Sequence, residues 1–537
     1  MTPSRVPGPE VTRPAVSRRR FLGITAGVGL AAASARFDRG VGPLLVRAGD
    51  QPALPARPFT LGIASGDPLP DGVVLWTRLA PDPQAVGGGM PAPPVSVRWE
   101  VAHDEAFRRI VKRGAATAEP DAAHSVHVDA RGLGAGRDYF YRFRVGDFES
   151  DIGRTRTAPA ADASPSRARF AFASCQSYQD GYYGAHRHLA AEEDLAAVLW
   201  LGDYIYEGGV SPSAVRQHEG PEILDLEAYR RRYATYKSDS ELQAAHLAHP
   251  WIVTWDDHEV DNNYADDLAQ RDDQNPADFL ARRAAAYRAW WEHQPVRLPA
   301  PTGPDYKIYR RSSFGDLLTV HTLDTRQYRT NQPCGSSVDI GVPCADVDAE
   351  DATLLGAEQR RWFFDGLIDS TARWDLVAQQ VMMAPVSFAP EPANPVINLD
   401  QWDGYRHERG AVIKALAVEP RNPVVLTGDI HSSWVHDLDA ETSDASGTRT
   451  ETVATELVGT SISSEFPFSE VVTVAIGSQP TVKYFEGTRH GYVVGDLTRQ
   501  ELRADFRYVS STATPDVVVE TGASFVVEDR KPGAQEA

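Results

Sequence analysis

The chain has 537 residues, 42% of them hydrophobic, and a formal net charge of −20. This length exceeds what one hydrophobic core supports and indicates about two to four domains, while the apolar content excludes general disorder. The negative charge argues against a surface that binds nucleic acid, because such a surface repels phosphate backbones. It remains compatible with a phosphate ester bound at a metal ion, since the ion reverses the local field.

The N-terminus has the pattern of a twin-arginine signal peptide over residues 1–35. The arginines Arg18–Arg20 precede an apolar run over 23–33, and small residues at 33–35 offer a cleavage site. The alternative, a short membrane anchor, is disfavoured because a bilayer needs about 20 apolar residues. No later segment has the length and continuity of a transmembrane helix. We therefore predict export by the twin-arginine machinery to a secreted, extracellular or cell-wall location.

An all-β region is predicted after the signal peptide. Residues 36–57 are rich in Pro, Gly and Ala and are expected to form a flexible tether. Over 58–158, short alternating or apolar runs are separated by Gly, Pro and Asp. The predicted strands are Val73–Leu79, Val95–Ala102, Val126–Asp129 and Tyr139–Val145. Several short strands at this spacing are typical of a small sandwich domain of the immunoglobulin or fibronectin kind.

The periodicity changes after a linker over 158–168 that is rich in Ala, Ser and Pro. Strands alternate with helices from 169 to 525, which is typical of a layered α/β domain. The predicted strands are Arg169–Ala173, Val198–Leu201, Trp251–Trp255, Leu317–Leu323, Asp375–Gln380 and Pro423–Leu426. The predicted helices are Ala185–Leu195, Ile223–Lys237 and Pro276–His293. We expect a strand pair over Tyr492–Ser510 at the sheet edge and a frayed polar tail over 526–537.

The chain contains only three cysteines, Cys175, Cys334 and Cys344. An exported protein permits disulfides, and Cys334 and Cys344 flank a short loop, so we predict a bridge between them. Cys175 is then left unpaired. Metal ligation is one explanation for an odd thiol in an exported protein.

Polar clusters follow four of the predicted strands, at the points where the strands end. They are Ala173–Gln176, Gly202–Tyr206, Trp255–Asn263 and Thr427–His431. Ligands of open α/β sheets collect at the carboxyl ends of strands, so we expect these clusters to meet at one rim. Any one of them is compatible with ordinary turn or helix-cap chemistry. Four clusters in the same relation to a strand are harder to explain in that way.

Asp203 and Tyr206 suggest a metal site by themselves. A carboxylate and a phenol suit a hard ion such as ferric iron better than zinc, which prefers Cys and His. Two ions about 3.5–4 Å apart need one bridging carboxylate and separate ligands for each ion. Asp203 is suited to bridge, and Asp429 and His431, one residue apart, can face different ions. Gly202 lets the backbone approach closely at such a crowded site.

The order Gly-Asp, Asp-His-Glu and Gly-Asp-x-His resembles the calcineurin-like metallophosphoesterase superfamily. More specifically, the chain resembles the PhoD-type alkaline phosphatase/phosphodiesterase family at Ser174–Gln176, Gly202–Glu207, Trp255–Asn263, Leu323–Arg329 and Gly428–Ser432. The segments Leu61–Pro68 and Val74–Arg78 are similar to that family's N-terminal β-sandwich domain. The resemblance covers about residues 58–520. It implies a layered metallophosphoesterase β-sandwich flanked by helices, preceded by the all-β domain.

The resemblance also implies a ferric ion held together with calcium ions. The iron ligands would be Cys175, Asp203, Tyr206 and His431. Asp203 would bridge to calcium, which Asp429 would also bind. A further calcium ligand would come from Asn263, with Asn262 and Asp257 as competing candidates. Carboxylate and amide oxygens match calcium, and other divalent metals such as manganese or zinc are the alternative.

Two further side chains are candidate catalytic groups. His258 could protonate the leaving group or orient the phosphate; the alternative is a structural partner of a metal ligand. Arg326 could clamp a phosphate oxygen; the alternative is a salt bridge to Asp324 or another neighbour. Glu207 could support a metal ligand by contacting it, without binding the metal itself.

The resemblance therefore implies a secreted, metal-dependent phosphoric ester hydrolase of the alkaline phosphatase type. It would cleave phosphate monoesters and also diesters, including phospholipid headgroups, by attack of a metal-activated hydroxide or oxide. One alternative of the same fold is a dedicated phosphodiesterase or phospholipase D. A remote alternative is an extracellular binding protein with an inactive metal domain, which the loss of a ligand would favour.

Overall fold

The computed structural model describes residues 52–270, 274–335, 339–389, 394–418, 420–440 and 450–537. The predicted signal peptide and most of the predicted tether lie outside the described residues. The described residues belong to a single compact unit. Among the helices of these segments, none combines the length and the apolarity needed to cross a bilayer.

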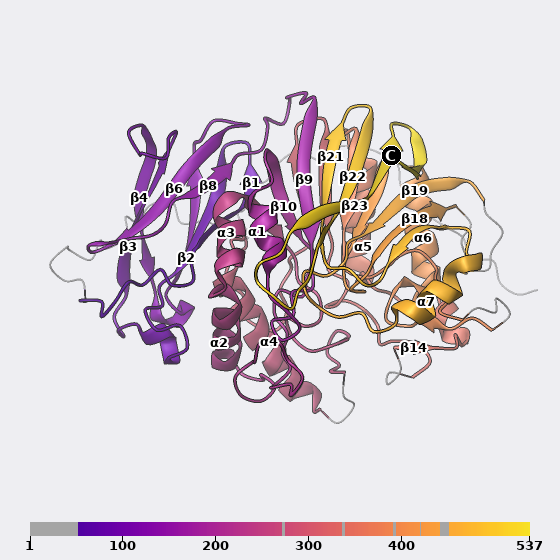
Figure 1. The fold of residues 1–537 in the computed structure, drawn as a ribbon, viewed down its shortest axis with the longest axis horizontal. Coiled ribbons are helices and arrows are strands. Elements are labelled where there is room, and N and C mark those ends of the chain that lie inside the picture. The colour runs from indigo at the N-terminus through magenta and orange to yellow at the C-terminus, as the bar shows by residue number, and fades with distance from the viewer. Residues whose placement is uncertain (1–51, 271–273, 336–338, 390–393, 419, 441–449) are drawn as a thin grey trace, which may run out of the picture. The chain divides into compact units, whose positions relative to one another are not determined.

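Two large sheets form the framework of the molecule (Figure 1). In spatial order, the ten strands of the first are β24 (Lys531–Glu536), β23 (Val519–Glu528), β22 (Glu501–Val509), β21 (Gly491–Thr498), β9 (Arg167–Ala173), β10 (Leu195–Trp200), β11 (Pro250–Val253), β1 (Ile63–Leu69), β2 (Gly72–Arg78) and β5 (Ser125–Arg131). The seven strands of the second are β12 (Arg310–Phe314), β13 (Leu318–Thr322), β15 (Trp374–Ala378), β17 (Pro423–Thr427), β19 (Thr452–Val458), β18 (Ser433–Asp439) and β20 (Val482–Glu486). The mixed α/β class predicted from the sequence is confirmed.

Side chains alternate between the two faces of each strand, and this alternation builds the layers. In β10, Ala197 and Leu199 join a core with residues of the second sheet, whereas Val198 and Trp200 join a core with helices. Those helices are α1 (Gly184–Ala190), α2 (Leu226–Lys237), α3 (Ser240–Ala248) and α4 (Pro276–His293). Another core joins the second sheet to α5 (Gly356–Ile368) and α6 (Arg406–Val418). The two sheets therefore face each other between layers of helices.

The N-terminal β-rich region shares a sheet with the α/β region. β1 pairs in parallel with β11 through Ser65 and Pro250, which adds β1, β2 and β5 to the first sheet. A separate sheet contains β4 (Ile110–Ala118), β3 (Val95–Ala102), β6 (Asp138–Val145), β7 (Phe148–Glu149) and β8 (Gly153–Arg156). Val73 and Leu75 of β2 pack in one core with Val97 and Tyr141 of this sheet. The sandwich expected over 58–158 is thus continuous with the rest of the molecule on one side.

Most predicted strands and helices are observed with ends within about three residues of the expected ones, but three expectations were wrong. The helix predicted over Ala185–Leu195 ends at Ala190, because Asp194 adopts a left-handed conformation (φ 59°) and turns the chain into β10. The pair β21–β22 is not at the sheet edge, since β23 and β24 continue the sheet beyond it. The tail expected to fray forms these two strands, which bury Val527 and Ala534.

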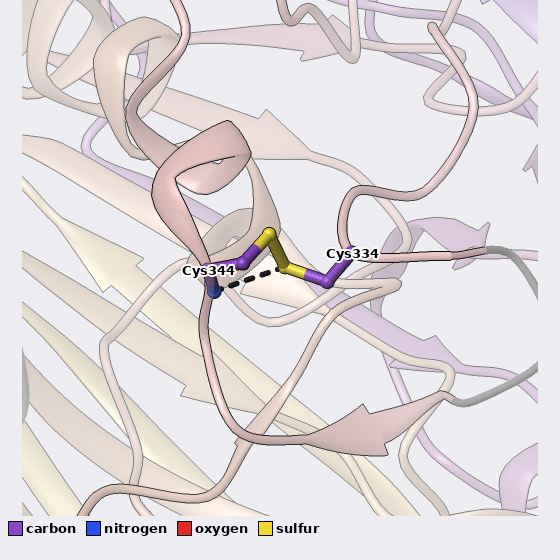
Figure 2. The surroundings of a disulfide bond; sticks show 2 residues. All are labelled: Cys334 and Cys344. Carbon is purple, nitrogen blue, oxygen red and sulfur yellow. Dashed lines mark hydrogen bonds between the residues drawn. A yellow bond between two sulfur atoms is a disulfide. The ribbon is translucent and has the colours of Figure 1, made fainter.

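The predicted disulfide between Cys334 and Cys344 is confirmed (Figure 2). The backbone N–H of Cys344 also donates to Cys334 Sγ at 3.0 Å. The bridge closes a loop that contains β14 (Ile340–Gly341), and β14 pairs with β16 (Ile397–Asn398). Cys175 is buried and unpaired, as expected.

Candidate metal centre

The predicted ligands follow the carboxyl ends of parallel strands from both sheets. Cys175 follows β9, Asp203 follows β10, and Asp257 follows β11 in the first sheet. Asp429 and His431 follow β17, which lies between the parallel strands β15 and β19 of the second sheet. Because the two sheets face each other, their carboxyl ends bring these segments together at one end of the sandwich.

Three groups of side chains with metal-binding atoms lie at this rim. Within each group the candidate ligand atoms lie within 4.8 Å of one another. The groups are Cys175 with Asp203 and His431, Asp203 with Asp257 and His258, and Asp256 with Asp257 and Asp429. Because Asp203 and Asp257 each belong to two groups, the three form one connected cluster.

Tyr206 belongs to the same cluster. Its hydroxyl donates to Asp203 Oδ2 at 2.9 Å and lies 3.1 Å from His431 Nε2. Ser464 Oγ donates to the phenol oxygen at 2.8 Å, and the carbonyl of Glu465 lies 2.9 Å from His431 Nδ1. The phenol and the imidazole are thus oriented toward the carboxylate by a segment that is distant in the sequence.

Asn263 and Asp257, two of the competing candidates, lie close together. The backbone N–H of Asn263 donates to Asp257 Oδ2 at 2.7 Å. Asn263 also lines a pocket of about 190 Å³ together with Asp429 and His431. Asn262 does not line this pocket, and its backbone N–H donates to Glu207 Oε1 at 2.9 Å.

The backbone at the cluster adopts conformations that L-residues rarely take. Left-handed φ values of 52–60° occur at five of the seven predicted ligands, Cys175, Asp203, Asn263, Asp429 and His431. Gly202 has a φ of 117°, and a Cβ atom there would lie 2.7 Å from the backbone nitrogen of Asp256. Such strain persists only where surrounding structure enforces it, and it is typical of functional sites.

The residues present fit bound cations. Asp203 Oδ1, Asp256 Oδ2 and Asp257 Oδ1 are buried without a hydrogen-bond partner among the described residues. Burial, together with the charge of Asp257, raises the pKa of Asp203 well above its usual value. Burial, together with the charge of Asp203, likewise raises the pKa of the Cys175 thiol. Buried anionic groups of this kind are stable when they coordinate metals, and cations at this cluster would reverse both shifts.

Arg326 is fully buried and is surrounded by carboxylates. Its Nε donates to Asp256, its Nη1 to Asp400 at 2.6 Å and its Nη2 to Asp429 at 3.0 Å. Asp324, the partner considered from the sequence, accepts a hydrogen bond from the backbone N–H of Arg326 at 3.0 Å and not from its guanidinium group. With its donors used in this way, Arg326 fits the salt-bridge interpretation better than that of a phosphate clamp.

His258 lies at the edge of the cluster, and 18% of its side chain is exposed. Its Nδ1 lies 2.7 Å from Glu207 Oε2, and its ring lies 4.1 Å from the ring of Tyr206. Burial alone would lower its pKa, but the charges of Glu207, Asp257 and Asp203 raise it well above the usual value. Glu207, which was expected to support a metal ligand, pairs instead with this candidate catalytic imidazole.

Glu259 has a positioning role that sequence reasoning missed. Its carboxylate accepts hydrogen bonds from the backbone N–H groups of Asp203 at 3.0 Å, Tyr204 at 2.7 Å and Asp256 at 2.9 Å. It thereby ties the loop after β10 to the loop after β11. Its place in the Asp-His-Glu block is the one signal that could have identified it. Ser464, whose hydroxyl binds the Tyr206 phenol, lies in no motif that could have identified it from the sequence.

Comparisons with known proteins agree with this geometry. A family model described as PhoD-like phosphatase matches residues 170–506, and a model of the PhoD-like phosphatase N-terminal domain matches residues 46–159. Alkaline phosphatase D from Bacillus subtilis (strain 168) is 44% identical over 530 residues, which is 96% of this chain and 88% of that protein. A solved structure of PhoD is 43% identical and superposes with a TM-score of 0.85, covering 90% of this chain and 93% of that chain. The present chain therefore belongs to the PhoD-like phosphatase family.

Proposed function

We propose that this protein hydrolyses phosphate monoesters and diesters with metal ions held by the cluster around Asp203. Family membership makes it a phosphoric ester hydrolase. The observation that carries the proposal is the connected set of buried ligand groups, in which three carboxylate oxygens have no hydrogen-bond partner among the described residues. Because every predicted ligand type is present, we disfavour the alternative of an inactive binding protein.

The donor atoms support a ferric ion at one end of the cluster and calcium at the other. Thiol, phenol and imidazole groups gather at Cys175, Tyr206 and His431, and the thiolate and phenolate that the first two would form on binding a cation favour the ferric state. Asp257, Asn263 and Asp429 offer carboxylate and amide oxygens at the other end, which suit calcium; manganese or zinc is the alternative. When bound, the ions would supply an activated water and neutralise phosphate charge.

The chain's own residues have separate tasks in this proposal. Asp203 lies between the two ends of the cluster and is the residue suited to bridge them. His258, which pairs with Glu207, is the group placed to donate a proton to the leaving alcohol. Arg326 does not contact the substrate; it positions Asp429 by a direct hydrogen bond.

The wider setting of the enzyme is part of the same proposal. We interpret the two facing sheets as the metallophosphoesterase sandwich and the strands before residue 158 as the immunoglobulin-like domain. The twin-arginine pattern at residues 18–20 supports export to a secreted or cell-wall location. Small phosphate esters or phospholipid headgroups are the expected substrates, and the net charge of −20 argues against nucleic acid.

The proposal is tested by purifying the exported protein, measuring its iron and calcium content, and comparing hydrolysis of an aryl phosphate monoester and a diester. Cys175→Ala and Asp203→Asn are expected to lose iron and at least about a hundredfold in kcat. The matched control is Asp162→Asn, an exposed acid outside the cluster, which should retain both. Wild-type activity in all three variants would contradict the site. An active protein without iron would contradict only the identity of the ion.

A further inference from the structure

The pocket beside the predicted ligands combines polar and apolar linings. Its polar lining includes Asn263, Asp400, Asp429 and His431. Its apolar lining consists of Ile340, Phe388, Ile430, Phe466, Pro467 and Phe468. Ile430 stands between two predicted ligands in the chain, so the two linings meet directly at the metal cluster.

The aromatic part of this lining is held in place. The carbonyl of Glu465 lies 2.9 Å from His431 Nδ1, which links the start of the segment 465–468 to a predicted ligand. The Phe466 ring meets Phe468 edge to face, with centroids 5.9 Å apart, and meets Phe485 in the same way at 6.3 Å. The surface is therefore formed before a substrate arrives.

Phe468 is unusual because 49% of this large apolar side chain is exposed. Because burying a Phe side chain is favourable, its exposure leaves apolar surface available to a ligand at the rim of the pocket. An exposed apolar surface that is continuous with a binding site is typical of ligand recognition.

A phosphate bound to metal ions held by Asp429 and His431 would have its ester oxygen beside this same pocket. We propose that Phe388, Phe466 and Phe468 form a subsite for the alcohol part of the substrate, so that the enzyme prefers phosphate esters of apolar alcohols. This inference rests on the proposed function. Ligand pockets usually measure about 300–1,000 Å³, and the smaller pocket here, about 190 Å³, fits a short chain or a single ring.

The charge of the pocket supports an uncharged alcohol. Asp339, Asp400 and Glu465 also line it. Asp400 is paired with Arg326 and Arg329. Asp339 and Glu465 are therefore the acids that would repel an alcohol carrying a second anionic group. The lining therefore selects against anionic alcohols as well as in favour of apolar ones.

A series of ethyl, butyl and hexyl phosphate tests the subsite, with each ester kept below the concentration at which micelles form. The three leaving alcohols have similar basicity, so chain length changes the apolar contact and leaves the chemistry alone. In the metal-loaded wild type, kcat/KM should rise with each added methylene, up to about fourfold. Equal kcat/KM for all three esters would overturn the inference.

Two variants identify the surface responsible. Phe468→Ser should lower the hexyl-to-ethyl ratio of kcat/KM by at least about threefold, because it removes apolar area from the pocket. The matched control is Val474→Ser, which lies in the short helix α7 (Ser469–Ala475), is 71% exposed and does not line the pocket. The hexyl-to-ethyl ratio of kcat/KM in Val474→Ser should equal that of the wild type.

The outcomes separate the inference from the proposed function. A wild-type ratio in Phe468→Ser, or an equal fall in Val474→Ser, contradicts the subsite. If Phe468→Ser does not fold, Phe388→Ser gives the same comparison. Failure of the metal-loaded wild type to hydrolyse any phosphate ester contradicts the proposed function itself, whereas hydrolysis that does not depend on chain length contradicts only the subsite.

Discussion

Arg326 neutralises the acidic end of the metal cluster from inside the protein. It is fully buried and binds Asp256, Asp400 and Asp429 at once. A buried charge that loses its partner is costly because neither solvent nor another ion compensates it. The role of this residue is therefore first one of positioning and stability.

We predict that Arg326→Met lowers the free energy of unfolding of the metal-free protein by about 3–5 kcal/mol, because it leaves several carboxylates buried without a counter-charge. Urea unfolding followed by tryptophan fluorescence measures the change. The control is Arg57→Met, which breaks the exposed pair with Asp151 and should cost at most about 1 kcal/mol. Unchanged stability in Arg326→Met would contradict this role in positioning and stability.

Lys237 is a buried lysine outside the metal cluster. Its Nζ has no hydrogen-bond partner among the described residues and lies 4.3 Å from the ring centroid of Trp76. Burial lowers its pKa well below the usual 10.5. The folded state therefore binds fewer protons at this site than the unfolded chain, and this group's contribution to stability rises with pH below 10.5.

We predict that Lys237→Met stabilises the protein at pH 7, by about 1–3 kcal/mol, because it removes a buried amine that has no hydrogen-bond partner among the described residues. The gain should shrink as the pH rises toward 10.5, since the neutral lysine costs less to bury. Unfolding midpoints at several pH values measure this. Lys414→Met, an exposed lysine in α6, should show no such trend. A gain that grows with pH would refute the explanation.

Many of the side chains that form the metal cluster were identifiable from the sequence, but the residues that position them were not. Asp203 and Asp429 were identifiable because a glycine and an acid follow an apolar strand. Glu259 and Arg326 act through contacts between segments far apart in the chain, and no local pattern reports such contacts. The left-handed backbone at Cys175 is likewise a consequence of the assembled rim.

At the scale of elements, the loop closed by Cys334 and Cys344 supports one part of the pocket. Asp339 and Ile340 lie inside this loop and line the pocket. Outside it, β16 pairs with β14 and contributes Asn398 to the same lining. The disulfide therefore restricts the motion of the loop that carries Asp339 and Ile340, and so of one side of the pocket.

We predict that the double variant Cys334→Ser/Cys344→Ser lowers the free energy of unfolding by about 2–3 kcal/mol, the value expected for a loop of about ten residues. Urea unfolding measures the loss. Treating the wild type with a reductant should give the same shift, because Cys175 is the only other cysteine and forms no disulfide. A reduced wild type as stable as the oxidised one would contradict this role of the bridge.

Helices and strands were predicted well where a local sequence pattern determines them, and poorly where pairing with another strand determines them. The helix Pro276–His293 was predicted to the residue, since its Asn275 cap and its length are features of the sequence. The C-terminal strands were missed because residues 526–537 look polar when read alone. They form strands because β24 pairs with β23, and the backbone N–H of Ala534 donates to Asp437 Oδ1 at 3.1 Å.

At the scale of the whole molecule, the first sheet joins parts of the chain that the family models treat separately. β1 pairs with β11, and Asp67 at the end of β1 binds Arg310, which begins the second sheet. The side chain of Trp76 on β2 also donates to the carbonyl of Glu292 in α4 at 3.0 Å. The sequence pattern predicted two domains joined by a linker, because pairing between distant strands leaves no local signal.

We predict that Gly66→Ala destabilises the whole described chain rather than its N-terminal region alone. A Cβ atom at Gly66 would lie 2.6 Å from the carbonyl oxygen of Trp251 in β11 and would also meet Pro295, so the β1–β11 junction must shift. Overpacking of this kind costs about 1–3 kcal/mol. Gly303→Ala, where a Cβ atom would meet no other atom within 4 Å, is the control and should unfold as the wild type does.

Scanning calorimetry should show one transition at a lower temperature for Gly66→Ala, because the continuous sheet couples both regions. Two separated transitions, with only the earlier one shifted, would show that the regions unfold independently and would contradict the coupling.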